Sequence, residues 1–439
     1  MAELRINTKW MASAQGEPEV AATTALLDIQ VDAVCLTRNQ DVWAETVRDN
    51  VFVSAYPLAM WFASAWWRLN HEPLPPQQPS LEWRMAHELG AANHGFVWPR
   101  IVLIPDGEAM HVWAEASMRQ DQSVQYLQAL DVPKAISQSG FRQSIDHFMH
   151  SVLARLQAKE LAGSPLAQLW AIVQEDLADP QATRLRKLEA QLGFDPEECP
   201  EQALSTALQW ESQLGEAALS ELAPAIAVSG ASPDLAFIGQ LASAHGVVGA
   251  PTISPDSIDH LDHGAPWERA AHDARALRQR LGNVSGPMLN QNLHDLLGLS
   301  HDAVAHWSAP EGRSPAAVAI PMGDQQLKFV PRKHNPAGQR FELARFLGEY
   351  LRPSNGEPRW LASTDLATSR QKYQRAFAAE LLCPIDALTS FLDGDFSSYA
   401  MEEAAGRFDV GEQTVSSLLR NHGLIHDHWA GHMPYHMAA

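Results

Sequence analysis

The chain has 439 residues, of which 46 % are hydrophobic and 19 % are charged, and its formal net charge is −20. This composition is typical of a globular protein, and the length suffices for two to four domains of roughly 100 to 200 residues each. So large an acidic excess argues against a protein that holds nucleic acid along a broad surface, unless its basic residues are clustered.

The beginning of the chain and the cysteines indicate where the protein works. The first twenty residues contain no apolar core of the kind that a signal peptide needs, and the longest apolar run, 55–67, is shorter than the ~20 residues that span a bilayer. Cys35, Cys199 and Cys383 form no CxxC pair, so they predict neither a disulfide framework nor a thiolate zinc site. We therefore expect a cytoplasmic protein without a membrane partner.

Residues 1–118 are rich in tryptophan, since eight of the 14 Trp residues lie at or before Trp113. Their hydrophobic patterns and turn residues predict a strand at 26–36, helices at 56–69 and 81–92, and a hairpin with strands 100–104 and 110–114. These elements together predict a small Trp-rich α+β domain.

The next region, residues 119–264, has a different pattern. From about 120 to 222, apolar residues recur at spacings of three and four, which predicts helices, and a stretch rich in Ala, Ser, Gly and Pro follows. We expect a helical middle with an acidic, linker-like end, then a domain at 265–425 and a His-rich tail at 426–439. The fold class expected for the whole chain is α+β, mostly helical.

Charge is distributed unevenly along the chain. Residues 188–268 contain 13 Asp and Glu but no Lys or Arg, whereas residues 328–375, the basic block, contain ten basic and four acidic residues. The acidic stretch is either a solvated surface or a docking face for a basic partner, and the basic block is a candidate binding surface for an acidic one. Its candidate partner-binding residues are Lys328, Arg332, Lys333, Arg340, Arg352, Arg370, Lys372 and Arg375.

Four ordered segments lie between residues 265 and 425. They are PWERAAHDARALR with the following GP and LHDLLG (266–298), RFELARFLGEYL (340–351), QRAFAAELLCP (374–384) and AAGRFDVGEQTVSSLLRNHGLI (404–425). This series resembles an ImmA/IrrE-type zinc metallopeptidase domain, in which the second and third segments correspond to the helices RFxLAHELGHxL and ANxFAAELLMP. The resemblance implies a zincin-related fold for about two fifths of the chain.

The catalytic positions of that family hold other residues here. In an HExxH helix two His residues bind zinc and the Glu is the general base. Arg345 stands at the first His, Phe346 at the Glu and Glu349 at the second His, while the third ligand falls on Tyr373, or on Gln371 if the spacing is longer. Arg cannot bind a metal and Phe cannot accept a proton, so we expect no zinc, no other cofactor and no catalytic residue.

The replaced residues allow two interpretations. Arg345 and Glu349 are four residues apart on a predicted helix, so they are expected to form an ion pair in place of the zinc, with Tyr373 stacked on the guanidinium and Phe346 in the place of the water. Alternatively, these positions hold whatever side chains pack.

The resemblance implies a catalytically inactive pseudo-metallopeptidase that recognises or regulates another protein, in a bacterial mobile-element, prophage, toxin–antitoxin, stress-response or phage-defence setting. One alternative is an active zinc endopeptidase with non-standard ligands, drawn from Glu342, Glu349, Glu380 and His334, that cleaves a regulatory protein. A second alternative is a nucleic-acid-binding regulator that uses the basic block. The partner and the oligomeric state stay open.

Three other patterns favour structural roles. His87 and His94 begin like a zincin helix but lie about 10 Å apart along it, so we expect an ordinary helix with one partly exposed His. Residues 401–419 have the spacing of a helix-turn-helix but carry few basic residues, which favours packing over DNA recognition. The histidines of the tail, from His422 to His436, indicate adventitious affinity for metals.

Overall fold

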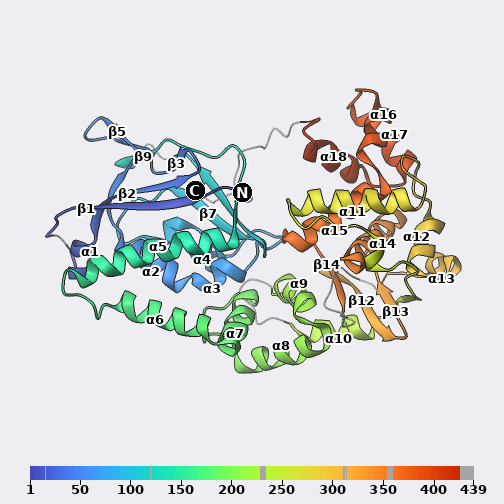
Figure 1. Cartoon of the computed structure of the whole chain (residues 1–439), viewed down its shortest axis with the longest axis horizontal. Coiled ribbons are helices and arrows are strands. Elements are labelled where there is room, and N and C mark those ends of the chain that lie inside the picture. The colour runs from blue at the N-terminus through green and yellow to red at the C-terminus, as the bar shows by residue number, and fades with distance from the viewer. Residues whose placement is uncertain are drawn as a thin grey trace. The chain divides into compact units, whose positions relative to one another are not determined.

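The computed structural model describes residues 1–14, 16–118, 121–227, 234–309, 312, 314–352 and 359–425. The chain is a mixed α+β protein that forms two compact units (Figure 1). Unit 1 is Met1–Leu204 with Ala227, and unit 2 is Ser205–Ile226 with the described residues from 234 to 425. The expected middle region is thus divided between the two units. Among the described residues, no helix is both long and apolar enough to cross a membrane.

Unit 1 contains three small antiparallel sheets. In the first, β2 pairs with β1 on one side and with β3 and β6 on the other, and the other two have the orders β10-β8-β7 and β5-β4-β9. The strands are β1 (Leu4–Trp10), β2 (Thr24–Val31), β3 (Val34–Cys35), β4 (Asn39–Asp41), β5 (Thr46–Arg48), β6 (Val51–Ser54), β7 (Arg100–Pro105), β8 (Ala109–Glu115), β9 (Val124–Tyr126) and β10 (Lys134–Ser137). The hairpin predicted at 100–114 is confirmed as β7 and β8.

The helices of unit 1 pack on these sheets or on one another. They are α1 (Pro18–Ala22), α2 (Tyr56–Ser64), α3 (Trp66–His71), α4 (Leu81–His87), the 3-10 helix η1 (Leu89–Ala92), α5 (Gln138–Gln157), α6 (Pro165–Ala178) and α7 (Pro180–Gln191). The helix predicted at 56–69 is present but interrupted at Ala65, and the helix predicted at 81–92 ends at His87. Residues 124–137, expected to be helical, form β9 and β10 instead, because they pair with β4 and β8.

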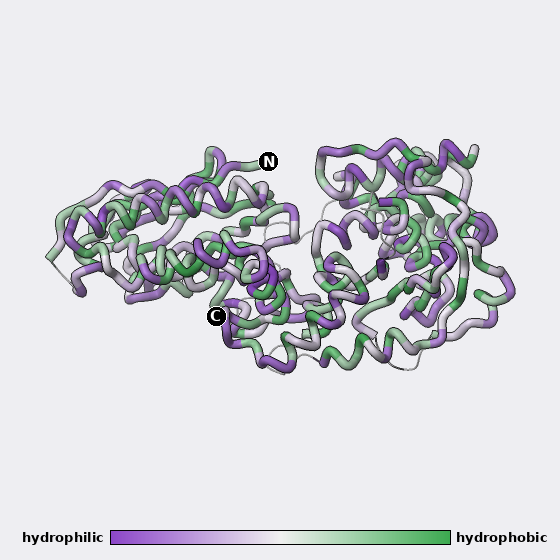
Figure 2. The backbone as a smooth tube through the Cα atoms, turned by 60° about the horizontal axis from the view of Figure 1, so that its bottom comes forward, coloured by the Kyte–Doolittle hydropathy of each residue, from purple (hydrophilic) through white to green (hydrophobic). Residues whose placement is uncertain are grey.

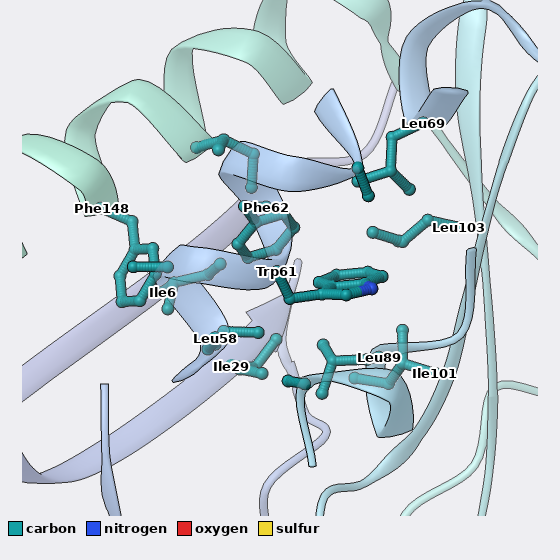
Figure 3. Packing of buried hydrophobic residues seen from close by; sticks show 14 of the residues in the cluster. Ile6, Ile29, Leu58, Trp61, Phe62, Leu69, Leu89, Ile101, Leu103 and Phe148 are labelled. Carbon is teal, nitrogen blue, oxygen red and sulfur yellow. The ribbon is translucent and has the colours of Figure 1, made fainter. Parts of the chain in front are cut away.

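The core of unit 1 surrounds α2, in which most residues are buried. Trp61 lies among Leu58, Leu89, Ile101 and Leu103 (Figure 3), and its indole nitrogen donates to the carbonyl oxygen of residue 85 at 2.9 Å. A helix that is apolar nearly all round belongs in an interior rather than at a surface. Most of the tryptophans of this region therefore stabilise the fold of unit 1.

Unit 2 is built on a four-stranded antiparallel sheet of order β11-β13-β12-β14. The strands are β11 (Val247–Gly249), β12 (Ala316–Gly323), β13 (Gln326–Val330) and β14 (Leu361–Thr364). The helices are the end of α8 (Glu201–Leu214), α9 (Glu216–Ile226), α10 (Ala236–Ser243), the 3-10 helix η2 (Pro255–Ser257), α11 (Pro266–Arg280), α12 (Asn290–Leu297), α13 (His301–His306), α14 (Pro336–Leu351), α15 (Ser369–Leu382), α16 (Ile385–Leu392), α17 (Ser398–Phe408) and α18 (Glu412–Asn421). Figure 2 shows hydrophobic and hydrophilic residues interspersed along the chain.

Helix α15 packs against both α11 and α14 in the interior of unit 2. The approach to α14 depends on Gly348, because a Cβ atom there would lie 2.6 Å from the ring of Phe377. At the other end of α15, the buried guanidinium of Arg278 donates to the carbonyl oxygens of Leu381 and Gly286. These contacts fix the three helices that carry most of the candidate site.

Candidate functional site

The residues at the zinc-site positions of the resemblance lie together between two helices. Arg345, Phe346 and Glu349 belong to α14, Gln371 and Tyr373 belong to α15, and all five side chains are buried. Residues of α14 four apart share a face, and α15 packs on that helix. The structure therefore brings the predicted positions together.

Arg345 is held by neutral groups. Its side chain is 3 % exposed, and its Nη2 atom donates to the carbonyl oxygen of Thr364 at 2.8 Å and to the side-chain oxygen of Gln371. Its Nε atom has no acceptor among the described residues. Burial, together with the charges of Arg375 and Arg332, lowers the pKa of Arg345 to about 9.

The carboxylate of Glu349 accepts hydrogen bonds from two residues of α15. One oxygen of its carboxylate accepts from Arg370, and the other accepts from the side-chain amide of Gln374 at 3.0 Å. The expected Arg345–Glu349 ion pair is therefore wrong. The carbonyl of β14 and the amide of Gln371 hold Arg345, while Arg370 on α15 holds the carboxylate, so neither group needs the other.

Tyr373 differs from the expectation as well. The guanidinium over its ring, 5.0 Å from the centroid, is that of Arg352 and not that of Arg345. Its hydroxyl donates to Asp273 on α11 at 2.6 Å, and His260 Nδ1 lies 2.8 Å from the same carboxylate oxygen. Burial and the charge of Asp273 raise the pKa of the Tyr373 hydroxyl, so this side chain remains a neutral hydrogen-bond donor.

Phe346 is apolar core. Its ring packs against Phe329 of β13 with the ring centroids 5.8 Å apart, and it is almost completely buried. A phenyl ring at this point has no lone pair to accept a proton from water.

The amide of Gln371 closes the free edge of the sheet. Strand β14 is an edge strand, and Gln371 accepts from the backbone nitrogen of Thr364 at 2.9 Å and donates to the carbonyl oxygen of Ala362 at 3.1 Å. Gln374 donates to the same carbonyl oxygen at 2.9 Å. An unpaired edge can accept an extended peptide as a further strand. Here two side chains of α15 make hydrogen bonds that such a peptide would make.

The sequence analysis missed Glu221 of α9. Both of its carboxylate oxygens lie 2.9 Å from the donating hydroxyl of Thr368, the residue that caps the N-terminus of α15. Burial raises the pKa of Glu221, and Arg370 opposes that shift. The only sequence signal is a Glu within an apolar helix, which does not identify its partner.

Part of the basic block is not an open surface. Arg332 and Arg340 are buried, and Arg332 forms ion pairs with Glu342 at 2.8 Å and with Asp365 at 2.6 Å. Arg340 donates to the side chain of Asn290 at 2.5 Å. These two residues correct the expectation of a partner-binding surface, because their charges are used inside the domain.

The other six members of the block are all partly exposed. Arg370 pairs with Glu349, Arg375 donates to the carbonyl oxygen of Leu366 at 3.0 Å, and Lys328 donates to that of Ala242 at 2.7 Å. The remaining members, Lys333, Arg352 and Lys372, are partly exposed.

The carboxylates considered as alternative zinc ligands are engaged elsewhere. Glu342 accepts from Arg332, Glu349 from Arg370, and Glu380 from Arg275 at 2.7 Å, while His334 lies exposed before α14. In the part of the chain that the structure describes, no three His, Cys, Asp or Glu side chains are placed to hold a metal ion. The residues at this site do not fit a zinc ion.

Of the two histidines, His87 is fully buried and His94 is exposed. The ring of His87 stacks on Trp83 with the centroids 4.0 Å apart, Nδ1 lies 2.9 Å from the carbonyl oxygen of Leu103, and Nε2 lies 3.2 Å from Glu72.

In the helix-turn-helix segment, α18 buries Val415, Leu418 and Leu419 in the core of unit 2. The tail at 426–439 lies outside the described residues.

Comparisons of the chain with protein-family models, with curated proteins and with solved structures found no match. The functional assignment therefore rests on the geometry of the site and on the sequence resemblance.

Proposed function

We propose that unit 2 contains a catalytically inactive ImmA/IrrE-like domain and that the protein recognises or regulates another protein in the bacterial cytoplasm. The observation that carries this proposal is the hydrogen-bonded network of Arg345, Glu349, Gln371 and Gln374 at the positions of the zinc site. The resemblance adds the biological setting, which is a mobile-element, toxin–antitoxin or phage-defence system.

Electrostatics supports an inactive site. A buried guanidinium stands where an imidazole would bind the metal, and two like charges close together in a medium of low dielectric constant repel strongly. Glu349 is a metal-binding residue type, but its oxygens already accept from Arg370 and Gln374. A zinc ion would have to displace these donors and would gain one carboxylate in return.

The closed edge of β14 supports recognition rather than peptide cleavage at this place. The amides of Gln371 and Gln374 already satisfy the carbonyl of Ala362, so an extended substrate would have to break these bonds before it could pair with the strand.

The two alternative functions gain less support. The suggested ligands of a non-standard zinc site lie apart, and the buried Arg332 and Arg340 remove part of the charge that a nucleic-acid surface would need.

Restoring the motif tests the proposal. The quadruple variant Arg345→His, Phe346→Glu, Glu349→His and Tyr373→Glu rebuilds HExxH with a third ligand, and the matched control replaces the same four residues by Asn, Gln, Asn and Gln. We expect the restored protein to bind one zinc per chain by elemental analysis, while the wild type and the control bind none. Circular dichroism checks that each variant is folded.

The opposite result is equally clear. Stoichiometric zinc in the wild-type protein, removed by EDTA together with a proteolytic activity, would show that the enzyme alternative is correct.

Affinity capture from the native host, with analysis of both proteins and nucleic acids, then separates the two remaining functions. A protein that is captured with the wild type, and lost when exposed residues of unit 2 are changed, supports recognition. Nucleic acid released by raised salt supports the second alternative.

A further inference from the structure

A buried positive charge lies between α14 and the edge strand β14 without a counter-charge. The guanidinium of Arg345 makes its hydrogen bonds through Nη2, to the carbonyl oxygen of Thr364 at 2.8 Å and to the side chain of Gln371, and both acceptors are neutral. Its Nε atom is buried and has no acceptor among the described residues. An ionised group in the interior is costly unless it is both paired and hydrogen-bonded, so this guanidinium lacks a partner that its position requires.

The nearby carboxylates do not supply this counter-charge. Glu342 accepts from the Nε atom of Arg332 at 2.8 Å, and Asp365 accepts from both terminal nitrogens of the same guanidinium, at 2.6 and 3.1 Å. Arg375 adds a further positive group, which donates to a backbone carbonyl oxygen and to no carboxylate in the described part of the chain. Arg345 therefore lies in a positive environment that an anion would neutralise.

A second unsatisfied polar group lies beside the first. Ser363 directly precedes Thr364, is fully buried, and its hydroxyl has no hydrogen-bond partner in the part of the chain that the structure describes. It pairs with Ala317 of β12, so the two side chains lie on the same face of the sheet. Ala317 belongs to the core that contains the buried apolar residues of α14, and the Ser363 hydroxyl is thus directed towards the helix that carries Arg345.

We propose that Arg345 and Ser363 hold a small monovalent anion, such as chloride, between α14 and β14. The Nε atom and the hydroxyl would donate to the ion, and the guanidinium would gain the counter-charge that the chain does not provide. Both residues are at most 3 % exposed, so the site favours a compact ion over a bulky or multiply charged one. A water molecule would complete the same hydrogen bonds but would leave the charge without a partner.

This site goes beyond the proposed function, because it would exist whether or not unit 2 recognises another protein. The ion would connect the helix to the edge strand, and it would be released when the two separate. Binding therefore stabilises the closed arrangement of α14 against local opening.

Hydrogen exchange of the α14 amides measures this stabilisation, because an anion that binds only the closed structure slows exchange through the open one. The full chain is compared in sodium chloride and in sodium gluconate at the same ionic strength, since gluconate is too bulky to enter. We expect chloride at about 200 mM to slow the exchange of α14 at least about twofold relative to gluconate. The amides of α5 in unit 1 should exchange equally in both salts and control for general effects of salt.

Three variants make the test specific. Arg345→Met should abolish the effect of chloride, whereas Arg280→Met, which removes an exposed positive charge from α11, should keep it. Ser363→Ala should reduce the effect of chloride and leave the exchange in gluconate unchanged, because the hydroxyl has no partner among the described residues. The proposal is overturned if chloride slows exchange in α14 no more than in α5, as expected for a bound water, or if Arg345→Met responds as the wild type does.

Discussion

Replacement of Arg345 by methionine tests whether the buried guanidinium stabilises unit 2 or is tolerated at a cost. Arg332 provides the matched control, because it is also buried but is paired with Glu342 and Asp365. The same substitution therefore removes an unpaired buried charge in one case and a paired one in the other.

The expected magnitudes follow from the environment of each charge. The pKa of Arg345 falls from the ordinary arginine value to about 9, and each unit corresponds to about 1.4 kcal/mol, so burying the charged form costs about 5 kcal/mol. Replacement by methionine removes two hydrogen bonds to neutral acceptors, each worth about 1 kcal/mol. The total loss is about 3 kcal/mol if one acceptor is left unsatisfied. We expect Arg345→Met to raise the free energy of unfolding by about 2 kcal/mol. Arg332→Met leaves buried Glu342 without its partner and should lower this free energy by about 3 to 5 kcal/mol.

The pH dependence of the free energy of unfolding tests the lowered pKa of Arg345 independently. Above about pH 9 the folded protein loses the Arg345 proton, which the unfolded chain keeps to much higher pH, so the stability contributed by this group rises with pH. The wild type should gain about 1 kcal/mol relative to Arg345→Met between about pH 9 and pH 10. The advantage of the variant therefore shrinks as pH rises.

Hydrogen exchange of the α14 amides, followed by mass spectrometry, measures the free energy of opening in unit 2 without interference from unit 1. Urea unfolding followed by circular dichroism gives the global value. The reasoning is refuted if Arg345→Met is destabilised by more than ~2 kcal/mol, or if the two arginine variants change stability in the same direction.

Two further substitutions test the packing and the electrostatics around α15. Gly348→Ala places a Cβ atom 2.6 Å from Phe377 and should lower the free energy of unfolding by about 1 to 3 kcal/mol. Gly406→Ala, in open space on α17, should raise it by about 0.5 to 1 kcal/mol. Thermal melts of both variants check this prediction, and equal shifts of the melting temperature would contradict it. Glu221 has a raised pKa in the folded state, so the stability it contributes is present at low pH and is lost as pH rises through that pKa. Glu221→Gln should therefore gain stability relative to the wild type between about pH 4 and pH 8 in melts at both pH values, and no gain at the higher pH would argue against the raised pKa.

Local patterns predicted the elements whose hydrogen bonds are local. The hairpin at 100–114 is confirmed because its turn and both of its strands lie within a short segment. The strands β9 and β10 were predicted as helix because they are three or four residues long and pair with distant strands. Similarly, the burial of His87 depends on Glu72, which lies 15 residues away and gives no periodic signal.

The basic block shows why counting charges along a sequence does not predict a surface. Arg332 and its partners Glu342 and Asp365 are ten and 33 residues apart, so no local window contains the whole ion-pair group. Burial of a charged group requires partners that satisfy it, and these partners come from other elements. The sequence therefore predicted where the positive residues lie along the chain but not which of them are neutralised.

The network between α14 and α15 also explains why one reversion should not rebuild a metal site. Arg345 and Glu349 share one face of α14, and this face meets Gln371 and the other polar side chains of α15. Arg345→His alone would remove one donor while Glu349 stayed bound to Arg370, and the carbonyl of residue 364 would lose a partner. Because partly satisfied buried networks are unfavourable, the ligands have to be replaced as a set. The same interdependence stabilises the present arrangement against single substitutions.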